Sequence, residues 1–267
     1  MGNLGQDFRV AIRSFKKSPV FVAVAVFSLA LGIGANTAIF TLVDQLLLRL
    51  LPVKDPQQLV LLWGRGEHYG SNNGRYKLSY PMYEDFRDHN QVFSGMFCRW
   101  ETSFSISDSG KTERVDGELV SGSYFPVLGV GPALGRVFTP EDDKVPGGHP
   151  YAVISHRYWQ SRFTGSPDVI GKKLMINGYP ITIIGVSQAG FDGTDPGSAP
   201  QIRIPVMMEA QMSPQFAEFY SLKTRRGRWV MVFGRLKPGV TLTEAKTALQ
   251  PYFHQMLEME VLEKDFA

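Results

Sequence analysis

The residues that could carry out chemistry in this chain are few and widely separated along the sequence. Histidine side chains bind a metal locally when two of them lie within about five residues of each other on one helix or loop. No two of the five histidines lie within four residues of each other; they are His68, His89, His149, His156 and His254. The sequence therefore contains no local zinc motif, and we expect no metal site.

One glycine- and lysine-containing segment resembles a phosphate-binding loop but lacks its chemistry. Such a loop has four residues between its glycines and a Ser or Thr after the lysine, whose hydroxyl binds magnesium. Here five residues separate Gly165 from Gly171, and Lys173 follows Lys172. The nucleophile elbow Gly-x-Ser-x-Gly does not occur in the sequence either. We expect no cofactor and no enzymatic activity.

The remaining reactive groups are carboxylates and one thiol. Residues 141–143 (Glu-Asp-Asp), Asp192 and Asp195 lie in Gly- and Pro-rich segments, which predicts solvated turn carboxylates. Calcium binding is the alternative, but the regular spacing of a calcium loop is missing. Cys98 lies in a strand-like run and is expected to be a small buried apolar residue. A lone cysteine also excludes a disulfide scaffold.

One dense basic run stands out in the second half of the chain. Lys223, Arg225, Arg226 and Arg228 precede the strand-like segment that starts at Trp229. The run predicts a solvated loop, and the alternative is a contact with acidic lipid head groups or an acidic partner.

The element that decides where all these groups are located relative to a membrane is an apolar stretch near the N-terminus. Residues 18–43 contain no charged side chain, and as a helix they would be about 39 Å long, enough to cross a hydrocarbon core of about 30 Å. Basic residues flank only the upstream side, which predicts a cytoplasmic N-terminus and an extracytoplasmic remainder. A cleaved signal peptide is an alternative, but this apolar core exceeds the usual 7–15 residues or so. A buried helix of a soluble protein is the other.

The basic residues before the span form part of an amphipathic pattern. Apolar residues recur at helical spacing from Leu4 to Phe15, and the cations available to lipid phosphates are Arg9, Arg13, Lys16 and Lys17. This pattern predicts a helix lying on the cytoplasmic surface of the inner membrane, and the alternative is a frayed basic tail. These four cations, offset by Asp7, account for the whole net charge of +3. The charge is therefore a membrane-topology signal, and nucleic acid is not an expected partner.

Small residues recur every four positions within the span. Ala30, Gly34 and Ala38 would share one face of the helix, and Asn36 could form a hydrogen bond across a contact at that face. We expect this face to pack against other membrane helices. The alternative is chance, because alanine and glycine are common in membrane spans.

The chain after about residue 50 changes to short elements typical of an α+β domain. Strand-like segments of three to nine residues alternate with turns and short helices, and Asn177-Gly178 is a strong hairpin signal. Residues 95–100 and 103–107 are predicted as two strands, and Ser123 is predicted to cap a short helix. Thr241 and Glu244 form a capping-box pattern before a closing helix. The expected organisation is residues 1–18 as a cytoplasmic amphipathic helix, 19–50 as a single membrane span and exit, and 51–267 as a mixed α/β extracytoplasmic domain.

Several ordered motifs together resemble one known family. They are residues 8–19 (FRVAIRSFKKSP), 29–40 (LALGIGANTAIF), 120–130 (VSGSYFPVLGV), 135–138 (GRVF), 153–156 (VISH), 170–178 (IGKKLMING) and 234–240 (GRLKPGV). In this order they resemble the N-terminal part of MacB/FtsX-type ABC transporter permeases, in particular the MacB-like periplasmic core domain. The resemblance covers nearly the whole chain.

The resemblance implies a mechanical, non-enzymatic function. In that family a separate cytoplasmic ATPase moves the permease helices, and the movement reaches the outer domain. It implies as partners membrane lipid, an ABC ATPase subunit and further permease helices, with a homodimer among the expected assemblies. The family's permeases continue with three more transmembrane helices, which this sequence lacks, so a fragment, a split gene product or a single-span accessory subunit is expected. A single-span binding or sensor module is the main alternative, and an anchored enzyme is the other.

Overall fold

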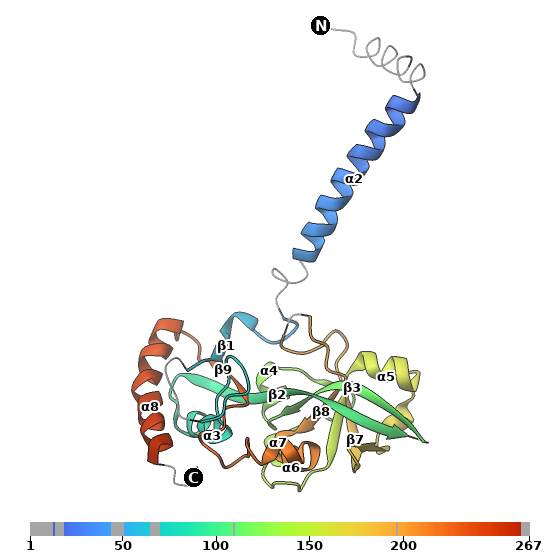
Figure 1. Cartoon of the computed structure of the whole chain (residues 1–267). Helices are drawn as coiled ribbons and strands as arrows, with labels where there is room; N and C mark the ends of the chain where they lie inside the picture. Colours follow the sequence, from blue (N-terminus) through green and yellow to red (C-terminus); the bar gives the residue numbers. More distant parts are fainter. Residues whose placement is uncertain are drawn as a thin grey trace. The chain divides into compact units, whose positions relative to one another are not determined.

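A computed structural model describes residue 13 and residues 19–43, 51–64, 70–108, 110–195 and 197–262. The chain divides into two compact units, residues 1–50 and 51–267, which are described separately. In the first unit, helix α2 (Pro19–Val43) is 25 residues long (Figure 1). Pro19 opens the helix, where the missing N–H of proline costs nothing. By length and composition, α2 is the one helix among the described residues that could cross a membrane.

The second unit is built on a mixed sheet of nine strands, which confirms the predicted α+β fold. The strand order is β1-β9-β2-β3-β8-β5-β7-β4, and β6 pairs with β2 and β7 outside this path. The strands are β1 (Leu59–Leu62), β2 (Phe93–Asp108), β3 (Lys111–Val120), β4 (Pro132–Gly135), β5 (Tyr151–Ile154), β6 (Lys173–Ile176), β7 (Tyr179–Ser187), β8 (Ile202–Pro205) and β9 (Met231–Leu236). Among these, β3–β8 and β5–β7 are parallel pairs.

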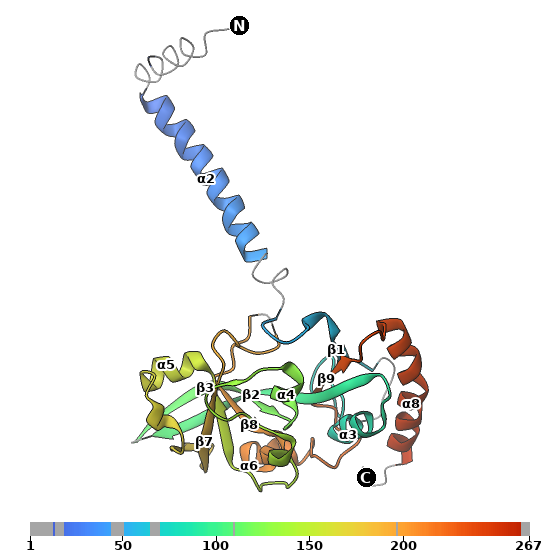
Figure 2. The same cartoon turned by 180° about the vertical axis from the view of Figure 1, so that it is seen from behind.

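Short helices connect and cover the strands. The α-helices are α3 (Tyr80–His89), α4 (Tyr124–Leu128), α5 (His156–Phe163), α6 (Glu209–Met212), α7 (Pro214–Ala217) and α8 (Leu242–Leu262), and the 3-10 helices are η2 (Pro56–Gln58), η3 (Pro140–Asp143), η4 (Pro167–Val169) and η5 (Val206–Met208). Helices α8 and α5 lie at opposite ends of this unit in both views (Figures 1 and 2).

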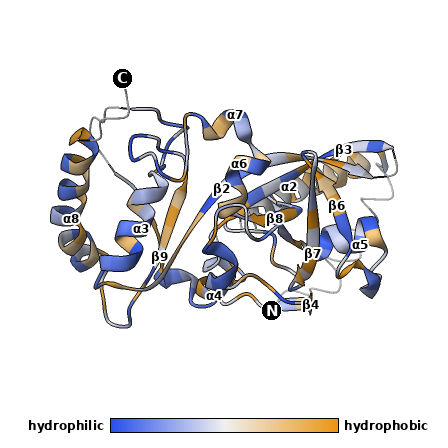
Figure 3. Ribbon diagram, turned by 90° about the horizontal axis from the view of Figure 1, so that it is seen from below, coloured by the Kyte–Doolittle hydropathy of each residue, from blue (hydrophilic) through white to orange (hydrophobic). Residues whose placement is uncertain are grey.

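Side-chain alternation along the strands creates one core on each face of the sheet. Phe97 belongs to one cluster of buried residues and Cys98, its neighbour in β2, belongs to the other. The larger cluster includes residues of α3, α5 and α8, and the smaller includes Tyr124 and Phe125 of α4. Strand β9 is hydrophobic along most of its length (Figure 3), as expected for a strand covered on both faces.

Local turn and cap signals in the sequence were mostly correct. Asn177 and Gly178 both have positive φ, 49° and 84°, as a two-residue hairpin turn requires. In the capping box, the Thr241 N–H donates to Glu244 Oε2 at 2.8 Å, and the Glu244 N–H donates to Thr241 Oγ1 at 3.2 Å.

Two local predictions were wrong. Residues 95–100 and 103–107 form one 16-residue strand, because β9 pairs with its first half and β3 with its second half. Ser123 precedes α4 but does not cap it with its side chain. Its hydroxyl donates instead to the Met96 carbonyl at 2.6 Å, so a long-range partner replaces the local one.

Two carboxyl groups lie in surroundings that disfavour their charge. The Asp143 Oδ2 atom accepts a hydrogen bond from the Gly122 N–H at 3.0 Å, whereas its buried Oδ1 atom has no partner among the described residues. Glu209 is 2 % exposed, and its Oε1 atom likewise has none. Burial raises the pKa of Asp143 to about 7 and that of Glu209 to about 7.

These two groups predict that the protein loses stability as the pH rises. A carboxyl whose pKa is higher in the folded state stabilises the fold fully below its unfolded pKa, near 4, and this stabilisation is lost as the pH rises through about 7. We expect the free energy of unfolding to fall between pH 4 and 8, with an upper limit of about 4 kcal/mol from Asp143. Urea unfolding of the full chain at several pH values measures the slope.

The double variant Asp143→Asn/Glu209→Gln should flatten this slope, because neither amide titrates. Glu141→Gln is the control, since the Glu141 side chain is 74 % exposed, and it should leave the slope unchanged. A double variant with the wild-type slope would contradict the prediction.

Candidate functional site

An arginine of strand β9 connects the segment that follows the first unit to the sheet by hydrogen bonds. We call residues 51–58 the neck segment. The Lys54 N–H donates to the Leu128 carbonyl at 2.9 Å. Arg235 donates from Nε to the Val127 carbonyl at 2.9 Å and from Nη1 to the Asp55 carbonyl at 3.0 Å. Arg235 is only 7 % exposed, so one buried side chain joins the neck segment, the end of α4 and β9.

The basic run that precedes β9 fixes helix α8. Arg226 donates to the backbone carbonyls of Glu260 and Val261 at 2.9 and 3.0 Å, which satisfies orphan carbonyls at the C-terminal end of the helix. Arg228 forms a buried ion pair with the Glu260 carboxylate, with Nη2 to Oε2 at 3.0 Å. We call Arg226 and Arg228 the clamp arginines.

The sequence prediction of a solvated loop for this run was therefore wrong for the arginines. Arg225 pairs with Asp85 of α3, Arg228 pairs with Glu260, and Arg226 donates to carbonyls of α8, so all three arginines have partners within the domain. Only Lys223 is exposed as predicted. The partners lie 32 or more residues away along the chain, beyond the reach of local pattern reasoning.

A cluster of buried charges lies between the sheet and the segment that joins β7 to β8. Glu118 of β3 accepts hydrogen bonds from Arg99 Nη1 at 2.6 Å and from Arg203 Nε at 3.0 Å. Both arginines are 0 % exposed. Arg99 also pairs with Asp195. Desolvation opposes the charge of Arg99, but the carboxylates of Glu118 and Asp195 outweigh it and raise its pKa.

Through this cluster the sheet holds the β7–β8 connection in place. Arg203 Nη2 donates to the Asp192 carbonyl at 3.1 Å, and the guanidinium lies 5.0 Å from the centre of the Phe191 ring. Asp192 and Asp195 were predicted as solvated turn carboxylates. The Asp192 carboxylate is 39 % exposed and pairs with exposed Arg157 at 2.7 Å, whereas the prediction was wrong for Asp195, which pairs with buried Arg99. The same correction applies to Asp142, which pairs with Arg136 at 2.6 Å.

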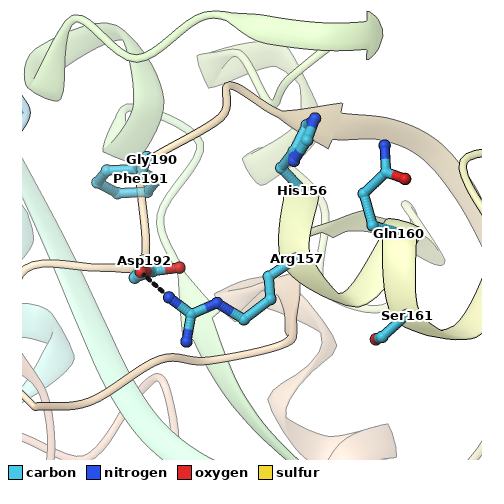
Figure 4. A pocket seen from close by; sticks show the side chains of 7 residues that line it. All are labelled: His156, Arg157, Gln160, Ser161, Gly190, Phe191 and Asp192. Carbon is cyan, nitrogen blue, oxygen red and sulfur yellow. Dashed lines mark hydrogen bonds and ion pairs between the residues drawn. The ribbon is translucent and has the colours of Figure 1, made fainter.

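Helix α5 and the β7–β8 connection line an open pocket of about 530 Å³. One face of α5 and the turn at Gly190 line it, and Arg157 reaches across toward Asp192 (Figure 4). The lining residues are His156, Arg157, Gln160, Ser161, Gly190, Phe191 and Asp192. The volume lies in the range of ordinary ligand pockets.

The structure brings none of the predicted reactive groups together into a metal site or a reactive centre within the residues it describes. No cluster of three or more His, Cys, Asp or Glu residues there could hold a metal ion. Cys98 is buried, as predicted, and burial raises the pKa of its thiol well above the ordinary value, which suppresses its nucleophilic form. Of the histidines, His156 lines the pocket.

The predicted packing residues of the first unit lie on α2. The side chains of Ala30, Gly34 and Asn36 are exposed, and a Cβ atom added to Gly34 would meet nothing within 4 Å. Ala38 belongs to the same helix, but its side chain lies outside the described part. Among the predicted lipid-binding cations Arg13 is exposed, and Arg9, Lys16 and Lys17 lie outside the described residues.

Comparison with known proteins decides the family. The model of the MacB-like periplasmic core domain matches residues 22–252, from within α2 to within α8. The chain belongs to this family. The sequence-based resemblance to it is therefore confirmed.

Solved structures of the family share the fold at low sequence identity. The periplasmic region of MacB from Actinobacillus actinomycetemcomitans has a TM-score of 0.55 and 15 % identity, covering 75 % of this chain and 84 % of that one. The extracellular domain of the noncanonic ABC-type transporter YknZ from Gram-positive bacteria has a TM-score of 0.51 and 13 % identity, covering 73 % and 95 %. No curated protein matches the chain.

The buried pair between Arg228 and Glu260 predicts a large loss of stability when one partner is removed. Glu260→Gln leaves the Arg228 cation buried without a counter-charge, which should cost about 3 kcal/mol of unfolding free energy. Thermal and urea unfolding of the full chain in detergent measure this loss.

Glu141→Gln is again the matched control, because it removes the Lys144 partner in an exposed pair and should cost less than about 1 kcal/mol. The double variant Arg228→Met/Glu260→Met should recover part of the loss. Equal stability of the Glu260→Gln and Glu141→Gln proteins would show that the buried Arg228–Glu260 pair does not stabilise the fold.

Proposed function

We propose that this chain is the permease component of an ABC-type export or mechanotransmission system. Its extracytoplasmic domain performs no catalysis and is coupled to a separate cytoplasmic ATPase. The observation that carries the proposal is the family match, because it includes most of the apolar helix as well as the sheet domain. A family defined across both parts favours a function that uses them together.

Arg235 and the clamp arginines supply a physical route for such coupling. A displacement of the chain at the neck segment would act on β9 through Arg235. The clamp arginines, which lie just before β9, would transmit this displacement to α8. Buried hydrogen bonds, the Arg228–Glu260 ion pair and a packed sheet deform little, so movement at one end of this route would displace the other.

The proposed topology follows the charge pattern around the span. Residues 1–18 form a helix on the cytoplasmic surface of the inner membrane, with Arg9, Arg13, Lys16 and Lys17 contacting lipid phosphates. Residues 19–50 cross the membrane and leave it, and residues 51–267 form the extracytoplasmic domain. Further permease helices pack on the face of Ala30, Gly34, Ala38 and Asn36, and two copies assemble with the ATPase dimer.

A binding or sensor module anchored by one span is the second candidate function. The pocket between α5 and the β7–β8 connection favours it, because a mechanical element does not need a pocket of about 530 Å³. Ligand-dependent thermal stabilisation of the full chain, without any permease or ATPase partner, would support this candidate over the first.

The proposed function is tested by isolating the complex from native membranes. The full chain carrying a C-terminal affinity tag is crosslinked in cells, purified in detergent and analysed by mass spectrometry. We expect an ABC ATPase and membrane proteins with permease helices to be recovered. Recovery of neither would refute the coupling, provided that the tagged chain is found in the membrane fraction.

The small-residue face of α2 makes a prediction with a closely matched control. Ala30→Leu adds bulk where a partner helix is proposed to approach, and we expect it to reduce recovery of the permease helices severalfold. Ala25→Leu makes the same change about 140° round the helix and should leave recovery unchanged. Equal effects of the two substitutions would show that this face does not select the partner.

A further inference from the structure

Hydrogen bonds to residues outside the pocket hold both walls of the pocket at α5 in place. On the α5 side, the Tyr158 hydroxyl donates to Glu113 at 2.7 Å and the Trp159 indole donates to the Ser166 carbonyl at 2.8 Å. On the other side, buried Arg203 holds the Asp192 backbone carbonyl at 3.1 Å. The backbone positions of both walls are therefore set before any ligand arrives, which is what a binding site requires.

The pocket offers hydrogen-bond donors from one wall and a single carboxylate from the other. Arg157 is 72 % exposed and contacts Asp192 through Nη2 alone, so most of its guanidinium N–H groups have no partner among the described residues. The side chains of His156 and Gln160 line the same wall (Figure 4).

Asp192 combines a fixed backbone with an exchangeable side chain. Its carbonyl is held by Arg203, whereas its carboxylate is 39 % exposed and makes one ion pair in a solvated setting. Such exposed pairs contribute only about 0–1 kcal/mol. A second carboxylate can therefore bind Arg157, beside Asp192 or in its place, at little cost to the fold.

We propose that this pocket docks an acidic side chain of a partner polypeptide outside the cytoplasm. The charge complementarity of Arg157, which accepts a bidentate carboxylate, argues for the acidic group. The inference rests on the proposed function only in placing the pocket outside the cytoplasm, and the binding needs neither the ATPase nor the other permease helices.

The test measures binding of a defined acidic peptide to the full chain in nanodiscs of zwitterionic lipid. A fluorescein-labelled tetraglutamate peptide with a blocked C-terminus is titrated by fluorescence anisotropy, and the same peptide made of glutamine is the reference. We expect tetraglutamate to bind and tetraglutamine not to bind. Arg157→Gln should weaken binding about threefold to fivefold, because an ion pair at an exposed guanidinium contributes up to about 1 kcal/mol.

Two further variants distinguish the pocket from general charge attraction. Asp192→Asn removes the competing carboxylate and should tighten binding about threefold. Lys246→Gln removes an exposed cation of α8 and should leave binding unchanged. Thermal unfolding of each variant verifies that it is folded. Because the Arg157 side chain is exposed, we expect its substitution to leave the fold intact.

Three results would overturn the proposal. These are wild-type affinity in the Arg157→Gln protein, equal binding of the glutamine peptide, and displacement of tetraglutamate by an equal concentration of free glutarate. The last result would assign the pocket to a small carboxylate instead of a polypeptide. Because no ATPase takes part, failure here leaves the proposed coupling untouched, and failure of the coupling leaves this pocket intact.

Discussion

Burying an arginine costs several kcal/mol unless its charge is met by a carboxylate and its N–H groups by acceptors. The second unit meets this condition repeatedly. Arg99 and Arg203 share Glu118 in the smaller core, and Arg228 meets Glu260 under α8. The Arg203–Glu118 and Arg228–Glu260 pairs join segments 85 and 32 residues apart, so the arrangement of the sheet, its connections and its closing helix depends on these charges being matched.

This constraint also bears on the proposed transmission of movement through the domain. Apolar contacts allow neighbouring elements to slide, whereas a buried ion pair has one favourable geometry and a steep cost for leaving it. Arg228 forms such a pair with α8, and Arg235 and Arg226 add directional hydrogen bonds to backbone carbonyls of the neck segment and of α8. The cores on the two faces supply bulk stability, and in the proposed function these arginines would determine which elements move together.

The elements that could be predicted from the sequence are those whose cause is local. The charge-free helix, the Asn177-Gly178 turn and the Thr241 capping box follow from residues within a few positions of each other. The pairing of β2 with β9, the role of Ser123 and the pairing of Asp195 depend on partners from 27 to 143 residues away. Arg99 and Arg203 carried a usable signal, because each is a cation flanked by apolar residues within a strand pattern.

The position of β9 in the sheet has a consequence for how the protein is made. β9 lies between β1 and β2, yet it follows β1 by roughly 170 residues. During synthesis, β1 and one edge of β2 therefore emerge long before the strand that pairs with both. Those edges stay open to other chains and to proteases for most of the synthesis. Maturation of this domain therefore depends on protecting an unfinished sheet until its last strand arrives.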